Sequence, residues 1–223
     1  MCGRFTLTTD LDQVEERFSF RRTADASFTP RYNIAPSQPV LAVIKDGDER
    51  RAGFLRWGLI PSWAKEEAIG NRMINARAET IAEKPSFKRA LQKRRCLVIA
   101  DGFYEWKAEG KKKTPMFITL QSREPFGFAG LWETWKAPSG EAIHSCTIIT
   151  TTPNKLMEAI HNRMPVILSR EAETVWLDRT IDDPQKLLPL LAPYSDKEMT
   201  VCEVSLFVNS PRNDSPACIE PVQ

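Results

Sequence analysis

Short stretches of alternating or fully apolar residues dominate the chain and predict strands. The segments with these patterns are 2–7, 40–44, 51–57, 96–100, 103–107, 116–120, 127–132, 144–150, 166–168 and 201–208. Asp46-Gly47 and Glu109-Gly110 are typical of tight hairpins between such strands. Because most strands follow one another through hairpins and few strand–helix–strand units occur, we expect an α+β fold with a mainly antiparallel, barrel-like β core.

Helical patterns occupy fewer and shorter segments. Thr9 to Asp12 resembles a helix N-cap with an acid three residues on, and Leu11, Val14 and Phe18 form the apolar stripe of the helix that follows. Further helices are expected at 87–92, after an interruption at Pro85, and at 154–160, 170–177 and 184–191. We expect these helices to lie at the periphery, and 21–39 and 58–63 to be loops.

Composition supports one compact domain covering 1–223. The chain has 223 residues and 42% hydrophobic composition, without a repeat, a low-complexity run or a linker. No apolar run approaches the ~20 residues of a membrane span, and no charged-then-apolar leader precedes Cys2. We therefore expect a cytoplasmic monomer without a membrane partner.

The cysteine content and the charge distribution indicate which metal, cofactor and nucleic acid sites to expect. The five cysteines form no CxxC pair and there are two histidines, so we expect no metal site and no cofactor, with Cys96 and Cys146 in the core. A net charge of +2 is too small to indicate nucleic acid by itself. Basic residues nevertheless gather at Lys84, Lys88, Arg89, Lys93, Arg94, Arg95 and Lys111-Lys112-Lys113. Such runs form a solvated face unless they flank a groove, where they bind phosphates.

Cys2 is the first candidate for chemistry. If Met1 is trimmed, Cys2 carries a free α-amine, with an ordinary pKa of ~7.7–8.0, beside a thiol with one near ~8.5. A 1,2-aminothiol of this kind converts an aldehyde first to a Schiff base and then to a thiazolidine ring. Alternation along 2–7 would bury Phe5 and Leu7 and place Cys2 and Arg4 on the opposite face. The alternative is an accidental cysteine on a frayed terminus.

Glu105 and His161 are candidate acid–base groups. Glu105 shares a predicted strand face with Phe103, between Tyr104 and Trp106. Burial among aromatic rings would raise the pKa of this carboxyl and suit it to proton transfer, whereas a solvent-facing strand glutamate would have no such role. His161 follows a predicted helix and is either a proton shuttle or a structural histidine.

Polar and aromatic residues elsewhere suggest ligand contacts. Asn75 and Arg77 share a face of an extended segment, which suits an oxygen-rich ligand; the alternative is a turn asparagine and a surface arginine. Arg163, close to His161, is a candidate phosphate contact. Pro36 and Trp63 lie in predicted loops, where Trp63 either stacks on nucleic acid bases or plugs the edge of the core.

Six motifs, in this order, resemble the SOS response-associated peptidase (SRAP) family. They are Met1-Cys2-Gly3-Arg4-Phe5, Arg31-Tyr32-Asn33-Ile34-Ala35-Pro36, Trp57-Gly58-Leu59-Ile60-Pro61-Ser62-Trp63, Ile74-Asn75-Ala76-Arg77-Ala78-Glu79-Thr80, Ala100-Asp101-Gly102-Phe103-Tyr104-Glu105-Trp106 and Ile160-His161-Asn162-Arg163-Met164-Pro165. The resemblance implies a β-rich α+β fold with a positively charged groove that binds single-stranded DNA and covalently captures abasic sites, in the cytoplasm and at the nucleoid.

The resemblance also assigns roles to residues. It implies Cys2 as the nucleophile, Asn75 as the residue that positions the sugar, and Glu105 and His161 as the acid–base pair. The implied DNA contacts are Arg4, Pro36, Trp63, Arg77, Trp106, Thr150 and Arg163. In some relatives a second tryptophan follows the first in the loop, whereas this chain has Ala64, so its stacking surface is expected to be smaller. The family's peptidase label fits self-removal of Met1, although a cellular aminopeptidase would serve equally.

Two other functions fit parts of the sequence. An N-terminal-nucleophile glutamine amidotransferase also begins Met-Cys-Gly, but no Gly-His-x-Arg-Trp segment follows here. A non-catalytic single-stranded-DNA-binding module would leave Cys2, Glu105 and His161 without a role.

Overall fold

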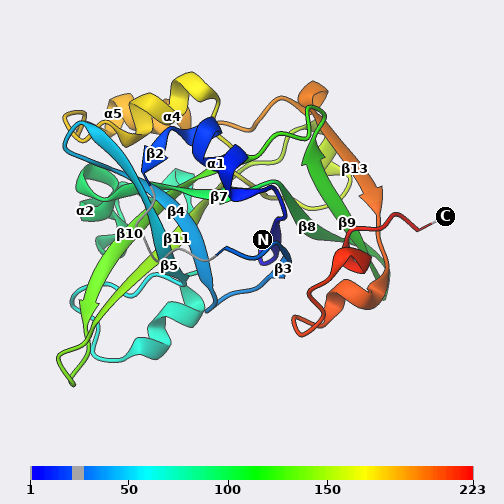
Figure 1. Cartoon of the computed structure of the whole chain (residues 1–223), viewed down its shortest axis with the longest axis horizontal. Coiled ribbons are helices and arrows are strands. Elements are labelled where there is room, and N and C mark those ends of the chain that lie inside the picture. Colours follow the sequence, from blue (N-terminus) through cyan, green and yellow to red (C-terminus); the bar gives the residue numbers. More distant parts are fainter. Residues whose placement is uncertain (1, 22–27, 223) are drawn as a thin grey trace.

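A closed β-barrel forms the centre of the computed structural model, which describes residues 2–21 and 28–222 (Figure 1). Its strands are β4 (Pro39–Asp46), β5 (Glu49–Trp57), β7 (Arg95–Ala100), β10 (Phe126–Lys136) and β11 (Ala142–Thr151). Neighbours pair antiparallel in the order β11-β10-β7-β4-β5. Parallel pairing of β5 with β11 closes the ring, so the expected barrel-like α+β core is confirmed.

A second sheet lies beside the barrel, at the right of Figure 1. Its strands run in the order β13-β9-β8-β1-β3 and comprise β1 (Phe5–Leu7), β3 (Arg31–Ile34), β8 (Gly102–Glu109), β9 (Lys112–Leu120) and β13 (Met199–Glu203). Three short strands extend the barrel sheet: β2 (Phe20–Arg21), β6 (Asn75–Arg77) and β12 (Met164–Pro165).

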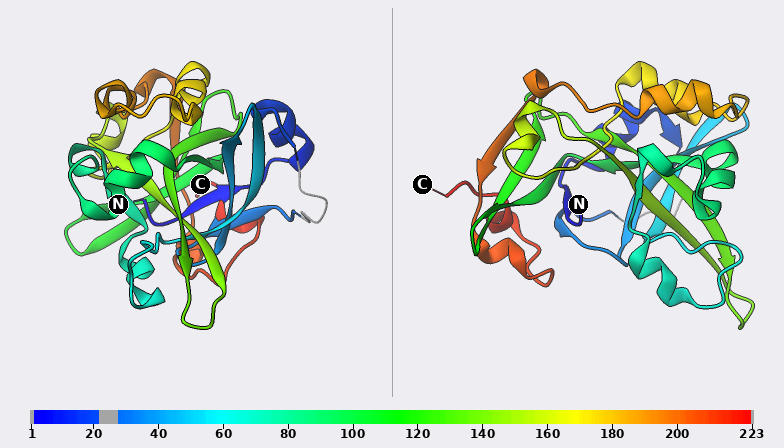
Figure 2. Two further views of the ribbon diagram at one scale, coloured as in Figure 1. Left: turned by 90° about the vertical axis from the view of Figure 1, so that its left-hand side faces the viewer. Right: turned by 180° about the vertical axis from the view of Figure 1, so that it is seen from behind.

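The N-terminal segment runs between the barrel and the second sheet, as both Figure 1 and the rear view in Figure 2 show. Phe5 fixes it there. Its ring lies 5.1 Å from that of Trp57 and 5.8 Å from that of Phe128, both edge-on, with all three side chains buried. Edge-to-face aromatic packing adds to the burial of apolar surface, so the first strand is held firmly against the barrel.

Short helices cover the outside of the sheets (Figure 2). They are α1 (Leu11–Phe18), α2 (Pro85–Lys93), α3 (Lys155–Glu158), α4 (Arg170–Leu177) and α5 (Pro184–Leu187). Short 3₁₀ segments occur at Glu67–Arg72, Ala78–Thr80, Leu188–Leu190, Asp196–Glu198, Leu206–Asn209 and Pro216–Cys218. Within the described residues, no helix is long and apolar enough to cross a membrane.

Several local expectations were wrong. The N-cap of α1 is Asp10, which accepts from the Asp12 amide; Thr9 instead donates to Asp101. Pro85 does not interrupt a helix but begins α2, where its missing N–H costs no hydrogen bond.

Strand boundaries also differ. The segment expected as a loop at 21–39 contains β3, while its residues 22–27 lie outside the described part. The strand expected at 2–7 starts at Phe5. At 166–168 the structure has an isolated bridge at Ile167 in place of the expected strand, directly after β12. The strand expected at 201–208 ends at Glu203 and gives way to a 3₁₀ turn.

Arg95, expected as part of a basic surface, is 5% exposed. Its guanidinium donates to Leu91 and Gln92 carbonyls in the last turn of α2. It also donates to three carbonyls, those of Trp176, Asp178 and Ile181, at and after the end of α4. Burial lowers the pKa of Arg95 to about 10. One cation therefore caps the carboxyl ends of two helices at once.

Replacing Arg95 by Met should lower the free energy of unfolding by about 3 kcal/mol, because several buried carbonyls lose their donor. Urea unfolding measures this loss. Arg89→Met, at an exposed position of the same helix, should stay within about 0.5 kcal/mol of the parent. Equal effects of the two substitutions would contradict the capping role.

Candidate functional site

Cys2 lies just before β1 and is fully buried. Its backbone carbonyl accepts a hydrogen bond of 2.7 Å from the Asn75 side-chain amide. Asn75 begins β6, whose parallel pairing with β11 sets its place beside the N-terminal segment. The other amide atom, Asn75 Oδ1, is buried and has no hydrogen-bond partner among the described residues. The structure thus joins two predicted site residues that are distant in sequence and leaves an acceptor next to Cys2.

Glu105 lies on the part of β8 that extends beyond its pairing with β1. Those two strands pair only at Phe5 with Phe103 and at Thr6 with Gly102. Glu105 is 3% exposed. Burial raises the pKa of its carboxyl, and the nearby His161 acts in the opposite direction. The expected desolvated carboxyl is confirmed, and the solvent-facing alternative is wrong.

The Cys2 thiol is held in its protonated form. Burial raises its pKa strongly, and the negative charge of Glu105 raises it further, while a hydrogen bond from the Arg4 backbone lowers it. The thiol and the carboxyl are therefore near enough to influence each other. A buried neutral thiol is a poor nucleophile, so any first attack from this residue favours a different atom.

A pocket of about 500 Å³ opens beside Glu105. It is lined by Arg4, Glu105, Trp106, Lys113, His161 and Asn209. His161 follows α3, whose N-cap Asn154 accepts from Met157. His161 Nδ1 lies 3.0 Å from the Arg163 backbone N–H and 3.3 Å from the Arg163 carbonyl, so the backbone of Arg163 orients the ring. The pocket therefore combines a desolvated carboxyl with an oriented imidazole.

Arg4 lines the same pocket. Its NH1 donates to Asn33 Oδ1 at 2.7 Å and to the Val208 carbonyl at 2.9 Å. Its guanidinium lies over the Trp106 ring, 5.6 Å from the centroid. Arg4 is thus a pre-oriented cation at the pocket, and Trp106 supports it.

Further predicted DNA contacts gather around β6, β11 and β12. Thr150 is paired with both Arg77 and Pro165. Arg163 donates both arms of its guanidinium to Glu79 and also contacts the Thr150 carbonyl. Arg77 is exposed, whereas the buried Thr150 hydroxyl donates to Ala76 at 3.4 Å. Thr150 therefore helps to build this corner from inside, and the arrangement does not offer its hydroxyl to a phosphate at the surface.

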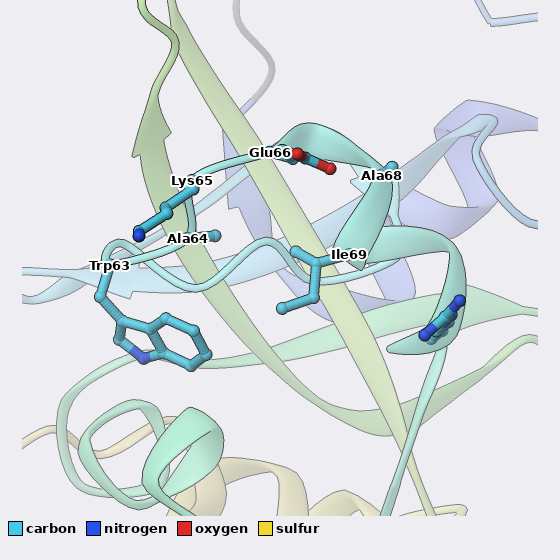
Figure 3. A pocket seen from close by; sticks show the side chains of 7 residues that line it. Trp63, Ala64, Lys65, Glu66, Ala68 and Ile69 are labelled. Carbon is cyan, nitrogen blue, oxygen red and sulfur yellow. The ribbon is translucent and has the colours of Figure 1, made fainter.

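Trp63 projects from the loop after β5 and is 60% exposed. It lines a hollow of about 450 Å³, with Ile69 on the opposite side (Figure 3). The Ala64 carbonyl accepts from the Trp135 indole at 2.7 Å, which fixes the loop. Plugging of the core by Trp63 is therefore wrong. Pro36 is partly exposed in a separate turn between β3 and β4, and DNA stacking by either residue stays a prediction.

Comparison with known proteins agrees with this geometry. The family model for "SOS response associated peptidase (SRAP)" matches residues 1–211. The chain belongs to the SRAP family. It is 53% identical over 222 residues to "Abasic site processing protein YoqW" of Bacillus subtilis (strain 168), covering 99% of each chain. It is 34% identical over 262 residues to "Abasic site processing protein HMCES" of Xenopus tropicalis, covering 98% of this chain and 78% of that protein.

A solved structure supports the same fold. A crystal structure of a protein from Bacteroides thetaiotaomicron superposes with a TM-score of 0.88 at 28% sequence identity and covers 100% of both chains. The arrangement of the barrel and the second sheet, with the N-terminal strand in the second sheet, is therefore shared with a crystal structure.

Two pocket residues were not predicted as site residues. Lys113 belongs to a lysine run at a hairpin, a pattern more typical of a solvated loop. Asn209 comes directly after the segment predicted as the last strand, 201–208, and no local pattern distinguishes it. Among residues 2–21 and 28–222, no cluster of three or more His, Cys, Asp or Glu side chains is arranged to hold a metal ion.

Ionisation of buried Glu105 should destabilise the fold as pH rises. Its pKa in the folded state lies above the ordinary 4.5, so the penalty is absent below 4.5 and grows as pH passes through the raised pKa. The stability of the parent relative to Glu105→Gln should thus decline in urea unfolding as pH rises above about 4.5.

Glu109→Gln supplies the control. Lys107 lowers the pKa of exposed Glu109 through a side-chain hydrogen bond, so the pH trend should have the opposite sign. A pH-independent difference between the parent and Glu105→Gln would contradict the buried carboxyl.

Proposed function

We propose that this protein processes abasic sites by binding single-stranded DNA and capturing the lesion covalently at Cys2. The observation that carries this proposal is the buried Glu105, which lines one pocket with His161 and whose charge raises the pKa of the Cys2 thiol. The names of the relatives, which are abasic site processing proteins, support the same substrate. Asn75 holds the Cys2 backbone at this place.

Nitrogen makes the first attack in the proposed reaction. Removal of Met1 exposes the α-amine of Cys2, whose ordinary pKa of ~7.7–8.0 leaves part of it neutral near pH 7. The thiol, by contrast, is kept protonated by burial and by Glu105. The amine attacks C1′ of the ring-opened deoxyribose, and one water molecule leaves as the Schiff base forms.

Sulfur then makes the adduct durable. The thiol sulfur adds to the imine carbon, and its proton passes to the nitrogen, which closes a thiazolidine ring without further loss of atoms. Glu105, with its raised pKa, is suited to protonate the sugar oxygen during ring opening, with His161 as its partner in proton transfer. A closed ring protects the lesion from the strand cleavage that a persisting imine promotes.

The remaining residues favour a DNA strand as the ligand. Arg4 and Lys113 line the pocket, and Arg77 is exposed on β6. Trp63 adds an exposed aromatic surface of the kind on which bases stack without sequence preference. Cations on a surface of this kind give affinity that falls with salt and does not depend on sequence.

Incubation with a single-stranded oligonucleotide that carries one abasic site tests the capture reaction. The parent should give a heat-stable, slowly migrating band on a denaturing gel. Cys2→Ser keeps the amine but lacks the sulfur, so its adduct should be lost on heating unless cyanoborohydride has first reduced the imine. Insertion of one alanine between Met1 and Cys2 should abolish the thiazolidine band.

Two results would sink the proposal. One is a heat-stable band of equal yield from Cys2→Ser without reductant. The other is retention of Met1, by intact mass, on protein that forms the crosslink. A simple DNA-binding module would form no covalent band at all, and an amidotransferase would instead release ammonia from glutamine.

Arg77→Gln should weaken the salt dependence of DNA binding. Loss of one phosphate contact should make the slope of log affinity against log salt shallower by about 0.7 for single-stranded DNA. An oligonucleotide with a tetrahydrofuran abasic analogue, which cannot crosslink, isolates binding. Lys93→Gln is the matched control, because Lys93 lies on α2 and pairs with Asp182; an equal change of slope there would contradict the placement of DNA over β6.

A further inference from the structure

The end of the chain contributes a wall of the pocket. Residues 204–221 pack beside β3, where the Asn33 side-chain amide donates to the Val208 carbonyl at 3.1 Å and to the Ser210 carbonyl at 3.0 Å. Val208 is buried, while Asn209 is exposed at the pocket. Because the backbone is fixed on both sides of Asn209, its side chain leaves the segment in a defined direction.

The hydrogen bond to Trp106 defines which amide atom of Asn209 faces the pocket. The Trp106 indole Nε1 lies 2.8 Å from Asn209 Oδ1. An indole nitrogen can only donate, so the amide oxygen must be the atom turned toward it. The NH₂ group of Asn209 therefore points away from the indole, and among the described residues it has no acceptor.

Two cations stand near that amide group. Lys113 lies two residues before Pro115, which pairs with Trp106 across β8 and β9, so Lys113 and Trp106 share a face of this sheet. Arg4 packs on the Trp106 ring from the N-terminal segment. The acidic group of the pocket, Glu105, is buried. This side of the pocket thus presents two positive charges and one neutral donor, and the only acidic residue among the six that line the pocket is the buried Glu105.

We propose that Asn209, together with Lys113 and Arg4, binds a backbone phosphate adjacent to the abasic nucleotide. This inference rests on the function proposed above and adds a ligand contact to it. A phosphate group offers several strong acceptor oxygens, which match the amide N–H, the ammonium and the guanidinium. Asn209 also keeps Trp106, and through it Arg4, in place.

Asn209→Asp separates the two roles. The aspartate retains an oxygen for Trp106 but replaces the donor with a negative charge. Affinity for an oligonucleotide with a tetrahydrofuran abasic analogue should fall about tenfold or more, as expected for loss of a hydrogen bond to a charged group. Gln185→Glu, at an exposed position of α5, makes the same change in net charge and should alter affinity by less than about twofold.

Methylphosphonates identify the phosphate. Each phosphate flanking the analogue is replaced in turn by the neutral methylphosphonate, and binding of the parent and Asn209→Asp is compared. At the contacted position the parent should lose affinity, and the difference between the two proteins should shrink to about twofold or less. Lys113→Gln should give the same pattern at the same position. Thermal unfolding of each variant verifies that it is folded.

The phosphate contact and the capture reaction are tested by different outcomes. The inference is overturned if Asn209→Asp binds as tightly as the parent, or if its deficit is the same with every methylphosphonate. If Asn209→Asp does not fold, Lys113→Gln alone decides, and the absence of a position-specific effect overturns the inference. The crosslinking reaction is judged separately, because a parent that passes the binding tests but forms no heat-stable band contradicts only the capture chemistry.

Discussion

Burial of Phe5 is the constraint on which the site depends. Its ring packs against Trp57 and Phe128 of the barrel, while its backbone pairs with β3 and β8 of the second sheet. A chain terminus is ordinarily the least ordered part of a domain. Here the first strand is an inner strand of the second sheet and packs its Phe5 ring on the barrel, so the residues next to it lie near the centre of the molecule (Figure 1).

Burial of the N-terminal segment also gives the site its electrostatic character. Glu105 and Cys2 are both withdrawn from solvent, burial raises the pKa of both groups, and the charge of Glu105 raises the pKa of the Cys2 thiol further. An unionised carboxyl and thiol side by side cost less than two buried anions. Negative charge is therefore disfavoured at both positions.

The sequence predicted much of the site because the relevant motifs combine unusual residue types with fixed local context. Cys2, Asn75, Glu105 and His161 each lie next to a strand or turn that the hydrophobic pattern located, and the structure brings these elements together. The roles of residues near the chain end, and of residues with partners distant in sequence, were harder to predict from the sequence. Arg95 is indistinguishable in sequence from its surface neighbours, and only the packing of α4 against β7 shows that it is a buried cap.

Partners distant in sequence explain the other differences between the predicted and the observed structure. β3 lacks strong alternation and forms because β1 supplies its hydrogen bonds, with the chain end on its far side. The orientation of the Asn209 side chain is set by its hydrogen bond from Trp106, which lies more than a hundred positions earlier in the sequence. Periodicity describes which face of an element is apolar, but it contains no information about which distant segment covers that face.

Asp101 anchors the chain at the end of the N-terminal strand. Its carboxylate accepts from the Thr6 hydroxyl and from the backbone amides of Thr8 and Thr9, which locks the chain directly after Phe5. Three residue steps separate Phe5 from Cys2, a span of at most about 10 Å even when fully extended. A DNA strand joined to Cys2 would therefore be tethered within about one nanometre of the barrel. Such a short tether leaves the lesion little freedom to slide away, and it makes the whole folded domain an obstacle to any enzyme that travels along the strand.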